Sequence, residues 1–406
     1  MREVYLDNAA TTRVDERIVK LMTEVMLDAY GNPSSVHRVG RKAKVYLDKA
    51  REQVAALLNA QKDEIFFTSG GTESDNMALR GVAYAKRAKG KHIITTQVEH
   101  HAILHACEQL EKEGFSVTYL PVDEYGMVSV AAVEAAITPE TILISVMYAN
   151  NEIGTIMPIK EIGALARAKG ILFHTDAVQA AGQLELDVVR DNVDLLSMTA
   201  HKIHGPKGSG AIYIRRGVRL QPMLRGGAQE RQVRPGTEAV PGIAGLGLAA
   251  ELARENLGKN SAYVADLRDK LISGLFEKIP FLRLNGHPTQ RLANNANVSI
   301  EYIEGEGMLL SLDMVGIAAS SGSACTSGSL DPSHVLLATG LDHATAHGSL
   351  RLSLSHETTL ADIEYVLEKL PPIVERLRAM SPLYDAKVLQ CARAEQRGND
   401  CLRACK

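Results

Sequence analysis

The chain has 406 residues, of which 45% are hydrophobic and 23% are charged, and its formal net charge is −3. This composition excludes disordered and fibrous classes for the bulk of the chain, and the near-neutral charge gives no indication of a nucleic-acid surface. The five cysteines are few and odd in number, which favours a reducing compartment over a disulfide framework. Since neither a signal segment nor a membrane-spanning apolar run is visible, we expect a soluble, cytoplasmic protein.

Short apolar runs alternate with helical patterns between residues 51 and 215. Strands are predicted at residues 65–68, 92–95, 117–120, 142–147, 172–176, 195–199 and 211–214. Helices are predicted at residues 73–89, 103–112 and 159–169. Strands separated by helices are typical of an α/β fold in which helices cover both faces of a mostly parallel sheet.

The pattern changes after residue 239. A long helix is predicted at residues 243–278, followed by strands at residues 281–284, 297–300 and 349–353. We expect a large domain formed by residues 15–260 and a smaller α+β domain formed by residues 1–14 and 261–382. The polar residues 383–406 are expected to form a flexible tail.

An anion site is predicted where the strand at residues 65–68 runs into Ser69, Gly70, Gly71 and Thr72. A helix begins immediately afterwards, so free backbone N–H groups and the helix dipole favour a phosphate there. An ordinary helix cap with glycines in the turn explains the segment equally well. The segment matches neither nucleotide-binding glycine motif.

Lys202 follows a predicted strand, in a turn of small residues between His201 and His204. A partly desolvated lysine at such a position can attack a carbonyl group as a neutral amine. A solvated surface lysine is the simpler interpretation for any single lysine. Lys207 is the nearby competitor, but its Gly-Pro-Lys-Gly setting is typical of a tight surface turn.

Asp176 and His100 strengthen the case for Lys202, because Asp176 ends a predicted strand and His100 follows another. A carboxylate at the end of a buried strand needs a positive partner, and the pyridinium nitrogen of pyridoxal phosphate is one such partner. His100 could stack on an aromatic cofactor, whereas His101 fits an ordinary loop histidine. Open α/β folds bind their ligands at the ends of such strands.

Cys325 lies among serines and glycines at residues 319–329. Such a segment packs poorly, so we expect a mobile loop, whereas structural cysteines are usually buried among apolar residues. A metal or redox site formed by the tail cysteines is a weaker hypothesis, because the spacing of Cys391, Cys401 and Cys405 matches no zinc pattern.

Arg351 lies on a predicted strand, where a guanidinium group is expensive to bury without an anion. Binding of a substrate carboxylate by both arms of the guanidinium group is one interpretation. A surface arginine on an alternating strand is the other.

Taken together, these segments resemble the cysteine desulfurase family, within the class V aminotransferase group of fold-type I pyridoxal-phosphate enzymes. The matching motifs occur in the family's order, from about residue 5 to about residue 355: YLDNAATT, NPSSVHRVG, TSGGTESDN, EHHA, NNEIG, DAVQ, HKIHGPKG, RPGTE, SSGSACTSG and RLSLS. Thr199 stands where the family often has serine, and Gly226, Gly227 and Ala228 replace a more usual glycine triplet.

The resemblance implies a fold-type I enzyme with pyridoxal 5'-phosphate as its cofactor. Asp176 would pair with the ring nitrogen, His100 would stack on the ring, and Lys202 would bond the cofactor covalently. Asn151 and Arg351 would bind the substrate carboxylate. The implied phosphate ligands are Gly71, Thr72, Gln179, Thr199, His201 and, from the partner subunit of a homodimer, Thr237.

The implied reaction removes sulfur from L-cysteine and leaves L-alanine and a persulfide on Cys325, with His100 as a proton shuttle. The persulfide would supply an iron–sulfur scaffold protein, and Cys325 could thereby become a ligand of iron in a nascent cluster. The tail cysteines favour the nitrogen-fixation form of the enzyme over the general one. The alternatives are a selenocysteine lyase or a small-amino-acid aminotransferase of the same fold and, from another class, a non-catalytic scaffold or sulfur carrier.

Overall fold

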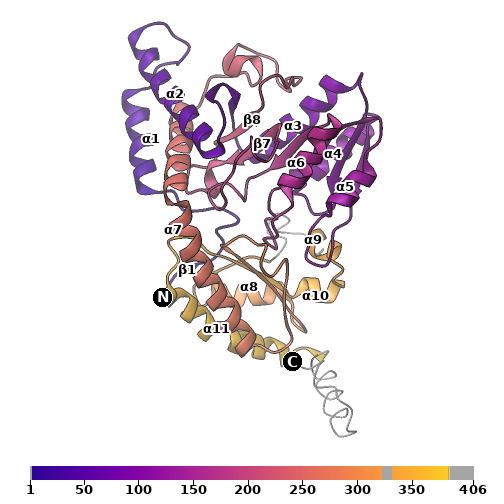
Figure 1. Ribbon diagram of the computed structural model, residues 1–406. Coiled ribbons are helices and arrows are strands. Elements are labelled where there is room, and N and C mark those ends of the chain that lie inside the picture. Colours follow the sequence, from indigo (N-terminus) through magenta and orange to yellow (C-terminus); the bar gives the residue numbers. More distant parts are fainter. Residues whose placement is uncertain (1, 322–331, 383, 385–406) are drawn as a thin grey trace.

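The computed structural model describes residues 2–321, 332–382 and 384. These residues form a larger body with a central sheet and a smaller body below it, and one long helix, α7 (Val240–Lys278), runs through both (Figure 1).

The central sheet has seven strands in the order β2-β8-β7-β6-β5-β3-β4. The strands are β2 (Ile65–Thr68), β3 (His92–Thr96), β4 (Ser116–Leu120), β5 (Thr141–Ser145), β6 (Leu172–Asp176), β7 (Leu195–Thr199) and β8 (Gly210–Ile214). The five strands from β4 to β7 are mutually parallel, and β8 is antiparallel to both of its neighbours. This arrangement confirms the predicted mostly parallel sheet.

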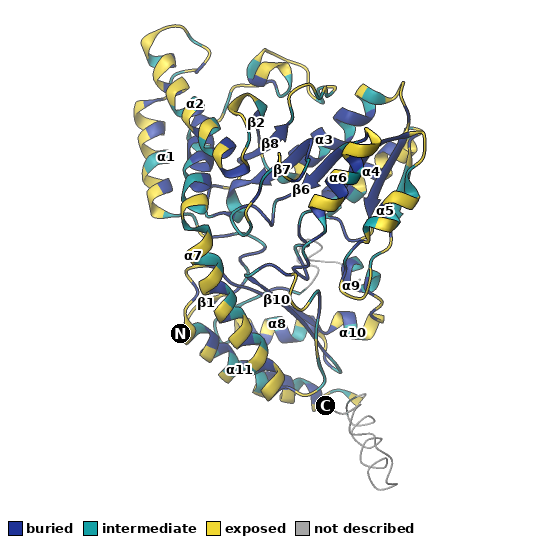
Figure 2. Ribbon diagram, in the orientation of Figure 1, coloured by how far each residue is buried: buried dark blue, intermediate teal, exposed yellow. Residues whose placement is uncertain are grey.

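Helices flank this sheet, so its strands are buried on both faces (Figure 2). They are α2 (Arg38–Leu58), α3 (Gly71–Lys86), α4 (His101–Lys112), α5 (Val130–Ala136) and α6 (Ile159–Lys169), while α1 (Glu16–Asp28) packs against α7. Strands with two covered faces cannot show the alternation of a half-exposed strand, which is why their sequences are continuous apolar runs.

The smaller body is built around an antiparallel sheet in the order β12-β10-β9, and a second, two-stranded sheet pairs β1 with β11. Its strands are β1 (Val4–Tyr5), β9 (Leu282–Leu284), β10 (Asn295–Ile300), β11 (Ile317–Ala318) and β12 (Ser349–Ser353). Its helices are α8 (Gly305–Asp313), α9 (His334–Ala338), α10 (His343–His347) and α11 (Leu360–Arg378).

The two ends of the described chain share one hydrophobic core, because Val4 and Leu6 pack with side chains of β10, β12 and α11. α7 belongs to two cores, through Leu246 in the larger body and Leu271 in the smaller one. The predicted domain boundaries stay a prediction, and the boundary at residue 260 falls inside this continuous helix.

Several predicted element ends are wrong for identifiable reasons. The strand expected to start at residue 281 begins at Leu282, because Phe281 has a left-handed backbone (φ 52°) that no strand accommodates. The strand expected to reach residue 147 ends at Ser145. The helix expected from residue 73 begins at Gly71, which places the predicted anion site within its first turn. No helix in the described ranges is long and apolar enough to cross a membrane.

Candidate active site

A cavity of about 360 Å³ lies at the carboxyl ends of the parallel strands, between the larger body and the smaller one. Ten of the residues predicted from the sequence line it, and they come from six separate segments of the chain. They are Gly71, Thr72, His100, Asn151, Asp176, Gln179, Thr199, His201, Lys202 and Arg351.

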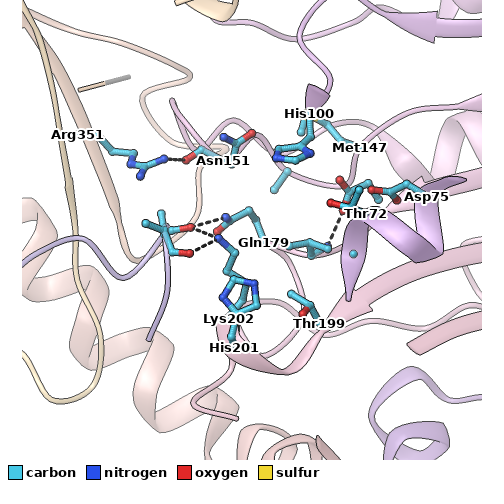
Figure 3. Close-up of a pocket in the computed structure, with 16 residues that line it drawn as sticks. Thr72, Asp75, His100, Met147, Asn151, Gln179, Thr199, His201, Lys202 and Arg351 are labelled. Atoms are coloured by element: carbon cyan, nitrogen blue, oxygen red, sulfur yellow. Dashed lines mark hydrogen bonds between the residues drawn. The ribbon is translucent and has the colours of Figure 1, made fainter. Parts of the chain in front are cut away.

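One end of the cavity is the amino-terminus of α3, a helix of 16 residues. A Cβ atom at position 71 would lie 2.7 Å from Cγ2 of Val178, so any larger residue there would force the Val178 side chain to move. Thr72 follows in the first turn and points into the cavity (Figure 3). Backbone N–H groups, the helix dipole and the hydroxyl group of Thr72 make this end suited to an anion.

Two buried carboxyl groups, those of Asp75 and Asp176, line the cavity near this end. Asp176 ends β6, and its Oδ1 atom accepts a hydrogen bond of 2.9 Å from the backbone N–H of Val178. Burial raises the pKa of Asp176 to about 6, while that hydrogen bond and the nearby Lys202 favour its charged form. A cationic ring placed against Asp176 would compensate its burial.

Lys202 ends a short 3₁₀ helix (Ala200–Lys202) directly after β7. Its Nζ atom donates hydrogen bonds to the backbone oxygens of Ala9 and Ala10, the latter at 2.7 Å. Gln179 Nε2 also donates to Ala9, at 2.9 Å, so the amino-terminal segment orients both side chains (Figure 3). The competing residue, Lys207, is exposed and lies outside this cavity.

His100 and His201 are neutral at physiological pH. Burial, followed by the charge of Lys202, lowers the pKa of each of them to about 4. Nδ1 of His100 accepts a hydrogen bond of 3.1 Å from the backbone N–H of Ala102. The ring proton of His100 is therefore assigned to Nε2.

Arg351 is 2% exposed and lies at the opposite end of the cavity from Thr72 (Figure 3). Its Nη2 atom donates to Oδ1 of Asp7 at 3.0 Å, and its Nη1 atom donates to the backbone oxygen of Asn151 at 3.0 Å. The expectation that this guanidinium group needs an anion holds, but a side chain of the protein already supplies one. Its Nε atom is buried and donates to none of the described residues.

One sequence-predicted residue of the described chain is not brought into the cavity. Thr237 lies in a separate hollow with Tyr30 and Pro33. Cys325 lies outside the described residues, as do Cys391, Cys401 and Cys405.

The sequence interpretation also missed two residues of the cavity region. Asp7 was overlooked because no local pattern connects it with Arg351. Asp75 has a visible signal: it follows Thr72 by three positions, which places both on one face of a helix.

The residues of the cavity fit a phosphorylated pyridine carbonyl compound. The glycine-lined helix start fits the phosphate, the buried Asp176 carboxylate fits a ring cation, and a lysine amine lies in the same cavity. Fold and site together define an α/β enzyme of the pyridoxal-phosphate class.

Comparisons with known proteins agree with this class. The family model "Aminotransferase class-V" matches residues 4–366. Cysteine desulfurase IscS of Methanosarcina thermophila is 57% identical over 94% of each chain, and that of Clostridium botulinum (strain Kyoto / Type A2) is 56% identical over 95% of this chain and 97% of its own. A solved structure of a NifS-like protein is 39% identical, has a TM-score of 0.87, and is matched over 93% of this chain and 100% of its own.

The chain belongs to the aminotransferase class-V family and, within it, to the cysteine desulfurases, which are pyridoxal-phosphate-dependent enzymes.

Proposed function

We propose that this enzyme takes the sulfur atom of L-cysteine, leaves L-alanine, and holds the sulfur as a persulfide on Cys325. The observation that carries the proposal is the cavity itself, in which Lys202 and Asp176 lie between an anion site and a buried arginine. When bound, pyridoxal phosphate supplies an electron sink for charge that develops at the substrate Cα.

The side chains of the cavity take separate parts in this reaction. Arg351 binds the substrate carboxylate through guanidinium N–H groups that Asp7 and Asn151 leave unused, and so orients the substrate. With the cofactor bound, Asp176 would hold a proton on the ring nitrogen, and the Lys202 amine would take the proton from the substrate Cα. The neutral His100 carries a proton on Nε2 that it can give to a reacting atom.

The sulfur step needs a nucleophile outside this group. The Cys325 thiolate attacks the substrate sulfur, a new S–S bond forms, and the C–S bond breaks with its electron pair moving to the substrate carbon. That carbon takes up a proton, and the product released is alanine. Overall, the Cys325 thiol and cysteine give a persulfide and alanine. Among the described residues Cys107 is the one cysteine, and burial raises the pKa of its thiol well above the usual range. Such a thiol is a poor nucleophile.

Replacing Cys325 by alanine tests this assignment. C325A should bind the cofactor normally, judged by its absorbance spectrum, but form neither alanine nor persulfide from cysteine. C107A is the matched control and should keep both products. Alanine formation by C325A at a rate near that of the wild type would contradict the nucleophile assignment.

A homodimer completes the proposal, with Thr237 of each chain contacting the phosphate in the partner's cavity. Two large apolar side chains that line the same hollow as Thr237 are exposed, Met26 (55%) and Tyr30 (75%). Leu27 (71%) and Val36 (88%) are also exposed in this part of the sequence. An apolar patch of this kind supports an interface. Light scattering should give twice the chain mass, and T237A should weaken cofactor binding. A monomer that binds the cofactor fully would contradict this part.

The sulfur acceptor we propose is an iron–sulfur scaffold protein, and the preference for a nitrogen-fixation role stays a prediction from the tail cysteines. Affinity capture with the full chain, loaded with sulfur from cysteine, tests the acceptor. Mass spectrometry identifies the proteins that the chain captures. Rates with cysteine, with selenocysteine, and with alanine plus a keto acid separate the desulfurase from its two alternatives.

A further inference from the structure

Asp75 has no part in the reaction described above, although it lines the same cavity as Asp176. It lies on α3, beside Thr72, at the end of the cavity away from Arg351 (Figure 3). Only 1% of the residue is exposed. Its Oδ1 atom accepts no hydrogen bond from any residue that the structure describes.

No cation balances Asp75. In the described part of the chain, the one basic side chain within 4 Å of its carboxylate is His174, whose Nε2 atom lies 3.7 Å from Oδ1. That distance is too long for a hydrogen bond. The two ring nitrogens of His174 are occupied by the hydroxyl groups of Ser145 (2.9 Å) and Ser197 (3.1 Å). Burial lowers the pKa of His174 to about 3, so the ring is neutral.

The remaining titratable neighbours do not supply a positive charge to Asp75 either. Asp176, at the end of β6, repels a charge on Asp75, whereas a side-chain hydrogen bond from Ser197 favours the charged form of Asp75 and lowers its pKa. Burial raises the pKa of Glu99, after β3, to about 8, so Glu99 adds to this repulsion only at higher pH. Lys202 acts on Asp176. Asp176 also accepts the backbone hydrogen bond from Val178, while Asp75 has no equivalent donor at Oδ1. Two buried carboxyl groups that repel each other do not both ionise, and the group with the better donors keeps the charge.

We propose that Asp75 and Asp176 act as a pair with one negative charge, in which Asp75 is a positioning residue that stays in its neutral acid form. Asp176 alone then faces the cofactor ring as an anion. An ionised Asp75 would push a proton onto Asp176 and remove the charge that holds the ring nitrogen. This inference rests on the role proposed for Asp176. Burial, together with the charge of Asp176, raises the pKa of Asp75 well above its usual value, which supports the same distribution of charge.

The D75N variant is the direct test, because an asparagine has the shape of the neutral acid but no proton to lose. Infrared spectroscopy of the loaded, full-length enzyme at neutral pH reports protonated carboxyl groups through a C=O band distinct from that of carboxylates. The wild type should show one such band that D75N lacks. Identical spectra in this region would overturn the proposal.

A second readout uses the bound cofactor. The pH midpoint of its absorbance change should be the same in D75N and the wild type, since neither carries a charge at position 75. A shift of about one pH unit or more in D75N, equivalent to about tenfold in proton affinity, would show that Asp75 is ionised and overturn the proposal.

The D176N variant separates this inference from the proposed function. It should lose cofactor affinity and shift the same midpoint. D176N could bind the cofactor as the wild type does, while the C=O band of the wild type is absent from the D75N spectrum. In that case Asp75 is a neutral acid, but Asp176 does not hold the cofactor ring. The positioning role then fails together with the role proposed for Asp176.

Discussion

Arg351 on β12 and Asp7 near the amino-terminus form an ion pair of 3.0 Å at one end of the cavity, although 344 residues separate them. The same guanidinium group donates to the backbone oxygen of Asn151 in the larger body. Arg351 is thus fixed by two segments before any substrate arrives, and such an arrangement reduces the entropy lost on binding.

Removing this arginine should weaken substrate binding more than it changes the cofactor. We expect R351A to raise the KM for cysteine ~10- to ~150-fold, the loss of a charged hydrogen bond worth ~1.5–3 kcal/mol. D7N is the matched variant, because it keeps an acceptor for Nη2 and removes only the charge, and its effect should be smaller. Steady-state kinetics and the cofactor spectrum measure both. An unchanged KM in R351A would contradict carboxylate binding by this residue.

The lysine assignment can be tested without a kinetic assay. Borohydride reduction should fix the cofactor to Lys202 in the wild type, and peptide mass mapping should find it there. K202A should retain no cofactor after reduction and denaturation, and its turnover should fall by at least ~10²-fold, the usual contribution of a general base. K207A, which changes an exposed lysine outside the cavity, should behave like the wild type. Cofactor attached to Lys207 would reverse the assignment.

Gly71 tests the anion site through sterics. G71A places a Cβ atom 2.7 Å from Cγ2 of Val178, and the resulting rearrangement, worth ~1–3 kcal/mol, should lower cofactor affinity ~5- to ~150-fold. Gly258 is the control, since it is exposed in α7 and a Cβ atom there meets nothing within 4 Å. G258A should raise the free energy of unfolding by about 0.5–1 kcal/mol and leave affinity unchanged. Equal affinities for G71A and the wild type would argue against a close anion at this turn.

Glu99 should make stability depend on pH. It is fully buried, its carboxylate accepts hydrogen bonds from the Met147 N–H and the Thr96 hydroxyl, and burial raises its pKa to about 8. Because the folded state holds a proton that the unfolded state releases, this residue's contribution is present at low pH and is lost as pH rises toward 8. The wild type should therefore lose up to about 1.4 kcal/mol per pH unit relative to E99Q between about pH 5 and 8.

Urea unfolding at several pH values measures this difference, with E108Q as the control for an exposed glutamate of the neighbouring helix α4. Parallel stability curves for E99Q and the wild type would mean that Glu99 is already ionised in the folded protein.

The sequence determined most of the sheet. β2, β6, β7 and β12 have the predicted limits, because apolar residues mark each strand and turn or loop residues bound it. The errors lie where backbone geometry overrides composition. Phe281 is apolar but has a left-handed conformation, and α3 begins at Gly71, within the predicted anion site.

The chemical residues of the cavity were also visible in the sequence, since Asp176 ends a strand, Lys202 and His100 each follow one, and parallel strands end at one edge. The tertiary structure alone decided which partners they have. Asp7 reaches Arg351, and Ala9 and Ala10 reach Lys202, across some 190 to 344 positions of sequence. Asp75 lines the same cavity as Asp176 because α3 packs against the sheet. Local patterns report which groups a segment carries, whereas the charge that each group holds depends on what burial places beside it.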